Sequence, residues 1–123
     1  MTDLFTPTDH QEWHYWASVF LAHVALGMVL VAALAAFLEA IAGEWIDDLG
    51  ALSWAIVVSV YGVFWEGVIQ NLGAGWADAA VDTFAVASGG AFGVFLWLRL
   101  PTRAAVVAAL VDAALWLGVR ARK

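Results

Sequence analysis

The chain has 123 residues, of which 64% are hydrophobic and 13% charged, with a mean hydropathy of +0.86 and a formal net charge of -6. A soluble domain of this length could not bury so much apolar surface, because small domains hide only about two thirds of what their unfolded chains expose. A lipid bilayer is the solvent that fits this composition. The acidic balance excludes nucleic acid as a partner, and the absence of cysteine excludes disulfides and thiolate chemistry.

Four apolar segments follow one another along the chain and predict an all-α, polytopic membrane bundle. We treat residues 1–123 as a single domain, since no internal repeat or long linker divides them. The first three segments each provide the roughly 20 residues that a membrane-spanning helix requires. We place their helices at about 14–42, 51–72 and 78–99.

The fourth predicted helix, at about 103–120, is shorter. Pro101 interrupts the chain before it, and Thr102 is its predicted N-cap. Its apolar part, 104–119, has about 16 residues and reaches only about 24 Å, and it carries Asp112 near its centre. The sequence therefore predicts a short transmembrane, re-entrant or interfacial helix here.

The positions of the basic residues indicate the orientation of the helices across the membrane. They form two groups, one before and one after the fourth segment: Arg99 and Arg103, then Arg120, Arg122 and Lys123. A spanning fourth helix would place the two groups on opposite sides of the membrane. A re-entrant or interfacial helix would place all five in the cytoplasm and the N-terminus outside, in agreement with the positive-inside tendency. We favour this second orientation.

Five polar side chains are predicted to lie together in one half of the membrane. His23 lies about two turns inside the first helix, Glu66 and Gln70 occupy the last turns of the second, and Asp78 and Asp82 the first turns of the third. Because neighbouring helices run in opposite directions, these depths coincide. An ionisable group in a membrane helix is costly, so it usually faces other helices or a water-filled cavity. We therefore expect a shared polar cluster.

Each of these residues also has a structural interpretation. Asp78 could be the N-cap or first-turn acid of its helix, and Glu66 with Gln70 could lie at the headgroup level. His23 could hydrogen-bond a backbone carbonyl. Asp82 is the hardest to explain in this way, because it lies a full turn inside the helix and an apolar run follows it.

Small residues accompany the polar ones at helical spacing. Gly27 follows His23 by one turn, and Gly89-x-x-x-Gly93 is a pattern that lets two helix backbones approach closely. We predict that these glycines pack helices together. Ser59 falls on the face of the second helix that carries its polar residues.

One run on the third helix resembles the signature of VanZ-like small membrane proteins and related short membrane proteins of bacteria and their phages: Asp82-x-x-x-Val86-x-x-Gly89-Gly90-x-x-Gly93. Two further elements of that family are similar to Glu66 with Gln70 and to His23 with Gly27. Where the family often has an asparagine, this chain has Val86. The resemblance implies a bacterial inner or plasma membrane protein with a polar cluster, and some family members are associated with the cell envelope.

The sequence predicts a subunit of a membrane complex or a homo-oligomer, with membrane lipids and other membrane subunits as partners. A first alternative is a VanZ-like envelope protein whose cluster binds a lipid headgroup, a cation or a metal, or relays protons; imidazole and carboxylate ligands suit Zn, Mn or Mg. A second is a holin-like or lysis-associated phage protein. The sequence nominates no serine or cysteine nucleophile, so an enzyme is not favoured, and it indicates no cofactor.

Overall fold

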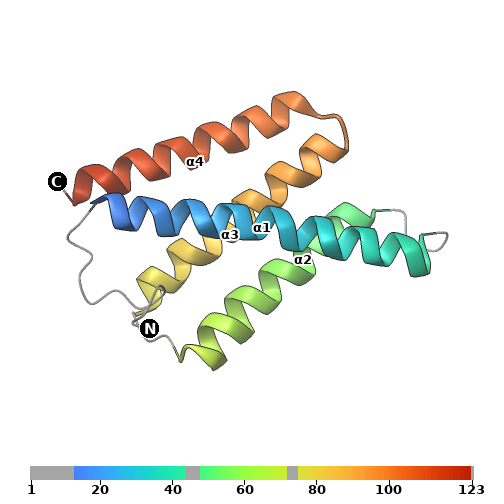
Figure 1. Cartoon of the computed structure of the whole chain (residues 1–123), viewed down its shortest axis with the longest axis horizontal. Helices are drawn as coiled ribbons and strands as arrows, with labels where there is room; N and C mark the ends of the chain where they lie inside the picture. Colours follow the sequence, from blue (N-terminus) through green and yellow to red (C-terminus); the bar gives the residue numbers. More distant parts are fainter. Residues whose placement is uncertain (1–12, 44–47, 72–74, 123) are drawn as a thin grey trace.

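The secondary structure is entirely helical in the part of the chain that this computed structural model describes, residues 13–43, 48–71 and 75–122. In chain order the helices are α1 (Trp13–Ala42), α2 (Leu49–Ser59), η1 (Val60–Ile69), α3 (Trp76–Trp97) and α4 (Pro101–Ala121) (Figure 1). The segment η1 continues α2 directly and has π-helical hydrogen bonding. The predicted all-α bundle is confirmed.

The fourth helix is longer than its predicted range. It has 21 residues, so it reaches about 31 Å, close to the roughly 30 Å of the hydrocarbon core. Like α1, α3 and the continuous α2–η1 helix, it is long and apolar enough to cross a membrane. The prediction of Thr102 as N-cap is wrong. Leu100 holds that position, and Pro101 begins the helix, where its missing N–H leaves no bond unmade.

The length of α4 changes the argument from the basic residues. Arg99 and Arg103 lie at one end of α4, whereas Arg120 and Arg122 lie at the other. A spanning α4 separates these groups across the membrane. The outward N-terminus that we favoured from the sequence requires a fourth helix that does not span, and it stays a prediction.

The helix α1 is central, because it packs against α2, α3 and α4 and most extensively against α3. The α1–α3 crossing is close at two glycines. A Cβ at Gly27 would collide with the carbonyl of Val86, and one at Gly89 would collide with the carbonyl of Val24. Small residues of this kind let helix backbones meet in a membrane, where packing rather than the hydrophobic effect drives association.

Two clusters of buried side chains flank this crossing. One joins α1, α2, η1 and α3 through Val31, Val57, Tyr61 and Val86. The other joins α1 and α3 through Trp16, Phe20 and Ala85, and apolar side chains of α4 pack against it. The Arg122 guanidinium lies 4.3 Å from the centroid of the Trp16 ring. This cation–π contact fixes the C-terminal end of α4 beside the start of α1.

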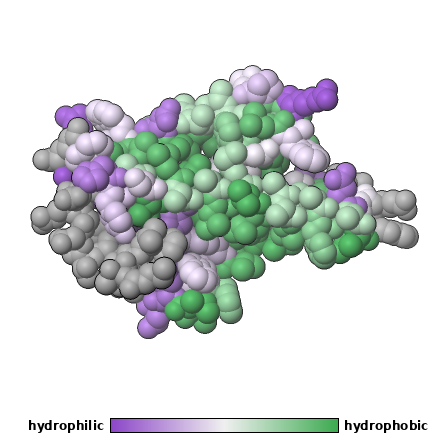
Figure 2. Space-filling view, in the orientation of Figure 1, coloured by the Kyte–Doolittle hydropathy of each residue, from purple (hydrophilic) through white to green (hydrophobic). Residues whose placement is uncertain are grey.

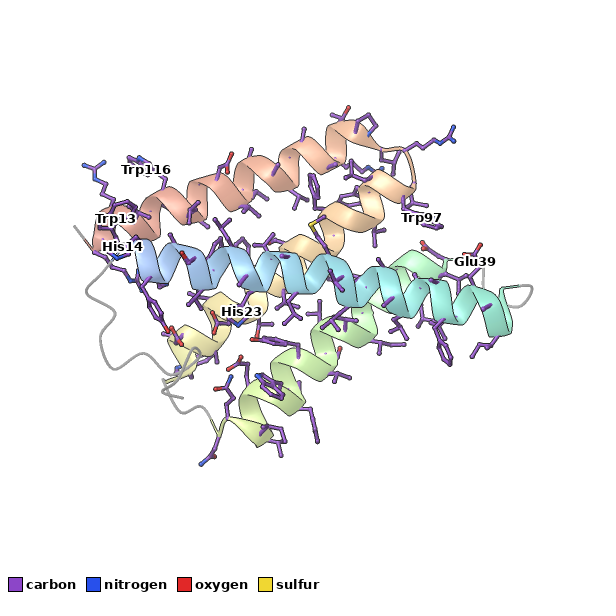
Figure 3. All side chains as sticks on the ribbon, viewed as in Figure 1. Trp13, His14, His23, Glu39, Trp97 and Trp116 are labelled. Atoms are coloured by element: carbon purple, nitrogen blue, oxygen red, sulfur yellow. The ribbon has the colours of Figure 1, made fainter. Side chains whose placement is uncertain are left out.

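The outer surface matches a lipid environment. Apolar residues cover the middle of the visible face and hydrophilic ones gather towards its ends (Figure 2). Trp13 and Trp116 lie at one end of the bundle and Trp97 at the opposite end, near Glu39 (Figure 3). Exposed indole rings at both ends suit the two boundaries between headgroups and hydrocarbon.

Candidate functional site

Polar side chains gather where the first half of α1, η1 and the start of α3 meet. His23 and Glu66 are buried, with exposed fractions of 2% and 5%, and the Asp82 side chain is 14% exposed. Asp82 lies within electrostatic range of His23, Asp78 and Glu66. Figure 3 shows His23 on the side of α1 that faces η1 and α3. Residues far apart in the sequence therefore share one buried region.

The orientation of the His23 ring follows from its contact with its own helix. Its Nδ1 lies 2.8 Å from the carbonyl oxygen of Val19. A carbonyl can only accept, so Nδ1 carries the proton and donates it. The other ring nitrogen, Nε2, faces Asp82 with 3.7 Å between Nε2 and Oδ2. That distance exceeds a direct hydrogen bond. The second ring nitrogen of His23 nevertheless faces the Asp82 carboxyl.

The π-helical bonding of η1 decides which side chains of this helix face inward. The buried residues along α2 and η1 are Ser53, Val57, Tyr61 and Glu66, and their spacing changes from four residues to five within η1. Hydrogen bonds in a π-helix join residues five apart, so Tyr61 and Glu66 lie on one face. Ser59 is exposed. The prediction that it shares a face with Glu66 is wrong, because η1 changes the register by one residue.

Tyr61 is a member of the site that the sequence did not nominate. Its ring meets that of His23 edge to face, with 5.9 Å between centroids. Its hydroxyl is buried and makes no hydrogen bond of good geometry among the described residues. The Glu66 carboxyl is close enough to interact with it weakly as a hydrogen-bond acceptor, and Asp82 and Asp78 lie within electrostatic range. A buried tyrosine hydroxyl usually finds a partner, so this one points to an incomplete site.

Gln70 and Asp78 lie at the edge of this region. The Gln70 side-chain nitrogen donates to Glu66 Oε1 across a long 3.5 Å. Asp78 belongs to the first turn of α3, whose N-cap is Gly75. Of its two predicted structural roles, Asp78 therefore holds the first-turn position, where a carboxylate is stabilised by the helix dipole. We call the six residues together the polar cluster: His23, Tyr61, Glu66, Gln70, Asp78 and Asp82.

The glycines predicted to pack helices lie at different distances from the facing helix. Gly27 and Gly89 form the α1–α3 crossing directly. A Cβ at Gly93 would meet its nearest neighbour, Met28 Cα, at 4.0 Å, which is ordinary contact. Backbone contact is therefore concentrated at the Gly89 end of the pattern. This crossing lies beside the cluster, since Gly27 follows His23 by one turn.

A groove between α1 and the α2–η1 helix opens beside the cluster. Its volume is about 640 Å³, within the range of ligand pockets. The walls include Leu26, Leu30, Ala33, Phe37, Ile56 and Val60. His23, Tyr61 and Trp65 line it at one end. We call this feature the α1–α2 groove.

Within the described residues, no group of three or more His, Cys, Asp or Glu side chains could hold a metal ion. Which metal, if any, the protein binds stays a prediction.

Asp112 of α4 is exposed, and within the described residues α4 makes no contact with η1. It is therefore not part of the cluster.

Four candidate spans and a buried polar cluster define the class of this chain as a polytopic helical membrane protein. Comparison with protein-family models, with curated proteins and with solved structures gives no match. The VanZ-like resemblance, the bacterial location and the predicted partners stay predictions.

Proposed function

We propose that this membrane protein binds a cationic group, best represented by an ammonium, at the polar cluster. The observation that carries the proposal is the meeting of the buried Glu66 carboxyl and the partly buried Asp82 carboxyl with a buried Tyr61 hydroxyl, which makes no hydrogen bond of good geometry among the described residues. This corresponds to the first alternative from the sequence, in which the cluster binds a headgroup or a cation. Assembly with other subunits and a holin-like role stay predictions.

The charge balance of the cluster favours a cation. Glu66, Asp78 and Asp82 are three carboxyl groups, and His23 is the only basic side chain in the cluster. If all three are ionised, the cluster itself carries a net charge of -2 even when His23 is protonated. Such charge within a membrane helix is costly unless it is paired. A bound cation would supply the missing pairing.

The donor and acceptor types favour an ammonium over a metal ion. Carboxylate oxygens accept hydrogen bonds, and the Tyr61 hydroxyl has lone pairs that can accept as well. An alkylammonium offers three N–H donors and could reach acceptors on η1 and α3 together. A metal requires several ligands at about 2.0 to 2.6 Å from one point, and the described side chains offer no such group.

The proposal is tested by titrating ethylammonium chloride into the protein in phosphatidylcholine nanodiscs and measuring the heat of binding. We expect Asp82→Asn and Glu66→Gln each to weaken binding about tenfold or more, because each removes a charged acceptor. Asp112→Asn is the matched control, since it removes the same charge from an exposed position on α4. Equal affinity for Asp82→Asn and the unmodified chain, or equal weakening by Asp112→Asn, would contradict the proposal.

A further inference from the structure

We infer that the ligand of this site is a single-chain cationic amphiphile whose ammonium head binds the polar cluster and whose alkyl chain lies in the α1–α2 groove. The inference rests on the proposed cation site and names the chemical class of its ligand. It comes from two adjoining features, the polar cluster and the apolar α1–α2 groove, which share His23 and Tyr61.

The two features share residues. His23 and Tyr61 belong to the polar cluster, and they also line one end of the groove. Tyr61 is 7% exposed and its hydroxyl makes no hydrogen bond of good geometry among the described residues. The other groove residues are all aliphatic or aromatic. A molecule in this groove therefore meets polar groups at one end only.

The length of the groove suits an extended chain. Along α1 its lining runs from His23 to Phe37, a separation of 14 residues on one helix. At 1.5 Å per residue this is about 21 Å, more than half of the roughly 30 Å hydrocarbon core. Ala33 lies on the α1 wall between larger side chains, so a bulkier residue there would narrow the path of a chain.

The charge of the cluster selects the head. A phosphate next to the ammonium would approach Glu66, Asp78 and Asp82, where the described residues of the cluster offer no arginine or lysine to receive it. Two arginines of α4 make cation–π contacts with tryptophans: Arg120 lies over the Trp116 ring and Arg122 over the Trp16 ring. Charge complementarity therefore favours an ammonium joined directly to the chain over a zwitterionic phospholipid.

Three probes distinguish the contribution of the ammonium head to binding from that of the alkyl chain. Hexadecylammonium carries both, hexadecanoate keeps the chain with an anionic head, and ethylammonium keeps the head without the chain. The measurement is the number of probe molecules that remain on the protein in native mass spectrometry after release from phosphatidylcholine nanodiscs. We expect one hexadecylammonium per chain. We expect hexadecanoate and retained phosphatidylcholine to be at least about tenfold less abundant.

Two substitutions at alanine positions of α1 test where the alkyl chain of the ligand lies. Ala33→Phe fills the groove, whereas Ala36→Phe makes the same change three residues along α1 at an exposed position that does not line the groove. We expect Ala33→Phe to lower hexadecylammonium retention about tenfold and to leave the calorimetric affinity for ethylammonium unchanged. Ala36→Phe should retain hexadecylammonium like the unmodified chain.

The outcomes distinguish the two proposals. Suppose that ethylammonium binding depends on Asp82, but hexadecylammonium is retained no better than hexadecanoate, or Ala33→Phe does not lower hexadecylammonium retention. The amphiphile inference is then wrong and the cation site stands. Preferential retention of phosphatidylcholine or hexadecanoate would also overturn the inference. If ethylammonium binding does not depend on Asp82 or Glu66, the cation site itself is wrong.

Discussion

The α1–α3 crossing and the η1 segment position neighbouring parts of the same site in different ways. At the crossing, two α-helices meet through Gly27 and Gly89, and each glycine faces backbone atoms of the other helix. In η1 the helix widens instead, and the π-helical spacing turns Tyr61 and Glu66 inward together. The α1–α3 crossing is fixed by close backbone contact, which a side chain at either glycine would prevent. The inward face of η1 depends on helical register, which the insertion or deletion of one residue can alter.

Deletion of one residue should destabilise the two regions to very different extents. Without Val63, which is 71% exposed in η1, Tyr61 and Glu66 would be four residues apart and would share a face of an ordinary α-helix. We expect this deletion to cost less than about 1 kcal/mol. Deletion of Leu30 in α1 would instead turn Gly27 away from the face of Val31, and we expect a loss above about 4 kcal/mol.

Thermal unfolding in a mild nonionic detergent measures both effects. Ethylammonium titration then shows whether the Val63 deletion preserves the site, as the register argument predicts. Similar losses of stability in the two deletion variants would contradict the distinction between a rigid crossing and an adjustable η1.

Substitution of the glycines should show how local the close contact is. Gly89→Leu places a side chain against the carbonyl of Val24, and we expect it to destabilise the fold by about 3 kcal/mol, at the upper end for overpacking. Gly93→Ala has room for its methyl group, and Gly67 of η1 has no atom within 4 Å of an added Cβ. Both alanine variants should differ from the unmodified chain by less than about 1 kcal/mol. Equal destabilisation at Gly89 and Gly93 would refute this assignment.

The smallest expected change in stability is for Tyr61→Phe. The substitution removes a buried hydroxyl that makes no hydrogen bond of good geometry among the described residues, so the free protein should be unchanged or slightly more stable. Ethylammonium binding should nevertheless weaken, by about fivefold or more, because the ligand loses an acceptor. A loss of stability without any change in binding would show that Tyr61 serves the fold alone.

The sequence was informative where regular geometry held. Hydropathy alone predicts the helices, because an apolar run of about 20 residues has few alternatives in a membrane. The alternating direction of the helices places His23, Glu66 and Asp82 at one depth, and the structure puts His23 within 3.7 Å of Asp82. Both arguments depend on helix length and direction, which the pattern of residues carries.

Tyr61 and Ser59 show where such reasoning fails. Five residues along an α-helix correspond to a rotation of about 140°, so an α-helical period separates Tyr61 from Glu66. Only the π-helical bonding of η1 brings them to one face, and no residue in Val60–Ile69 signals that bonding in advance. The one available clue was a tyrosine inside an apolar run, since its hydroxyl requires a partner when buried. The groove was equally hidden, because it depends on how α1 and α2 diverge.

The most direct test of the cation site is the distance between a bound ammonium and the Asp82 carboxyl carbon. Solid-state NMR can measure it with ¹⁵N-ethylammonium and protein labelled with ¹³C at the aspartate carboxyl groups. A charge-assisted hydrogen bond of about 2.8 Å from nitrogen to oxygen places that carbon about 3.5 to 4 Å from the nitrogen. We predict dipolar coupling at this distance that disappears in Asp82→Asn and persists in Asp112→Asn. Absence of the coupling in the unmodified protein, or its persistence in Asp82→Asn, would contradict the account.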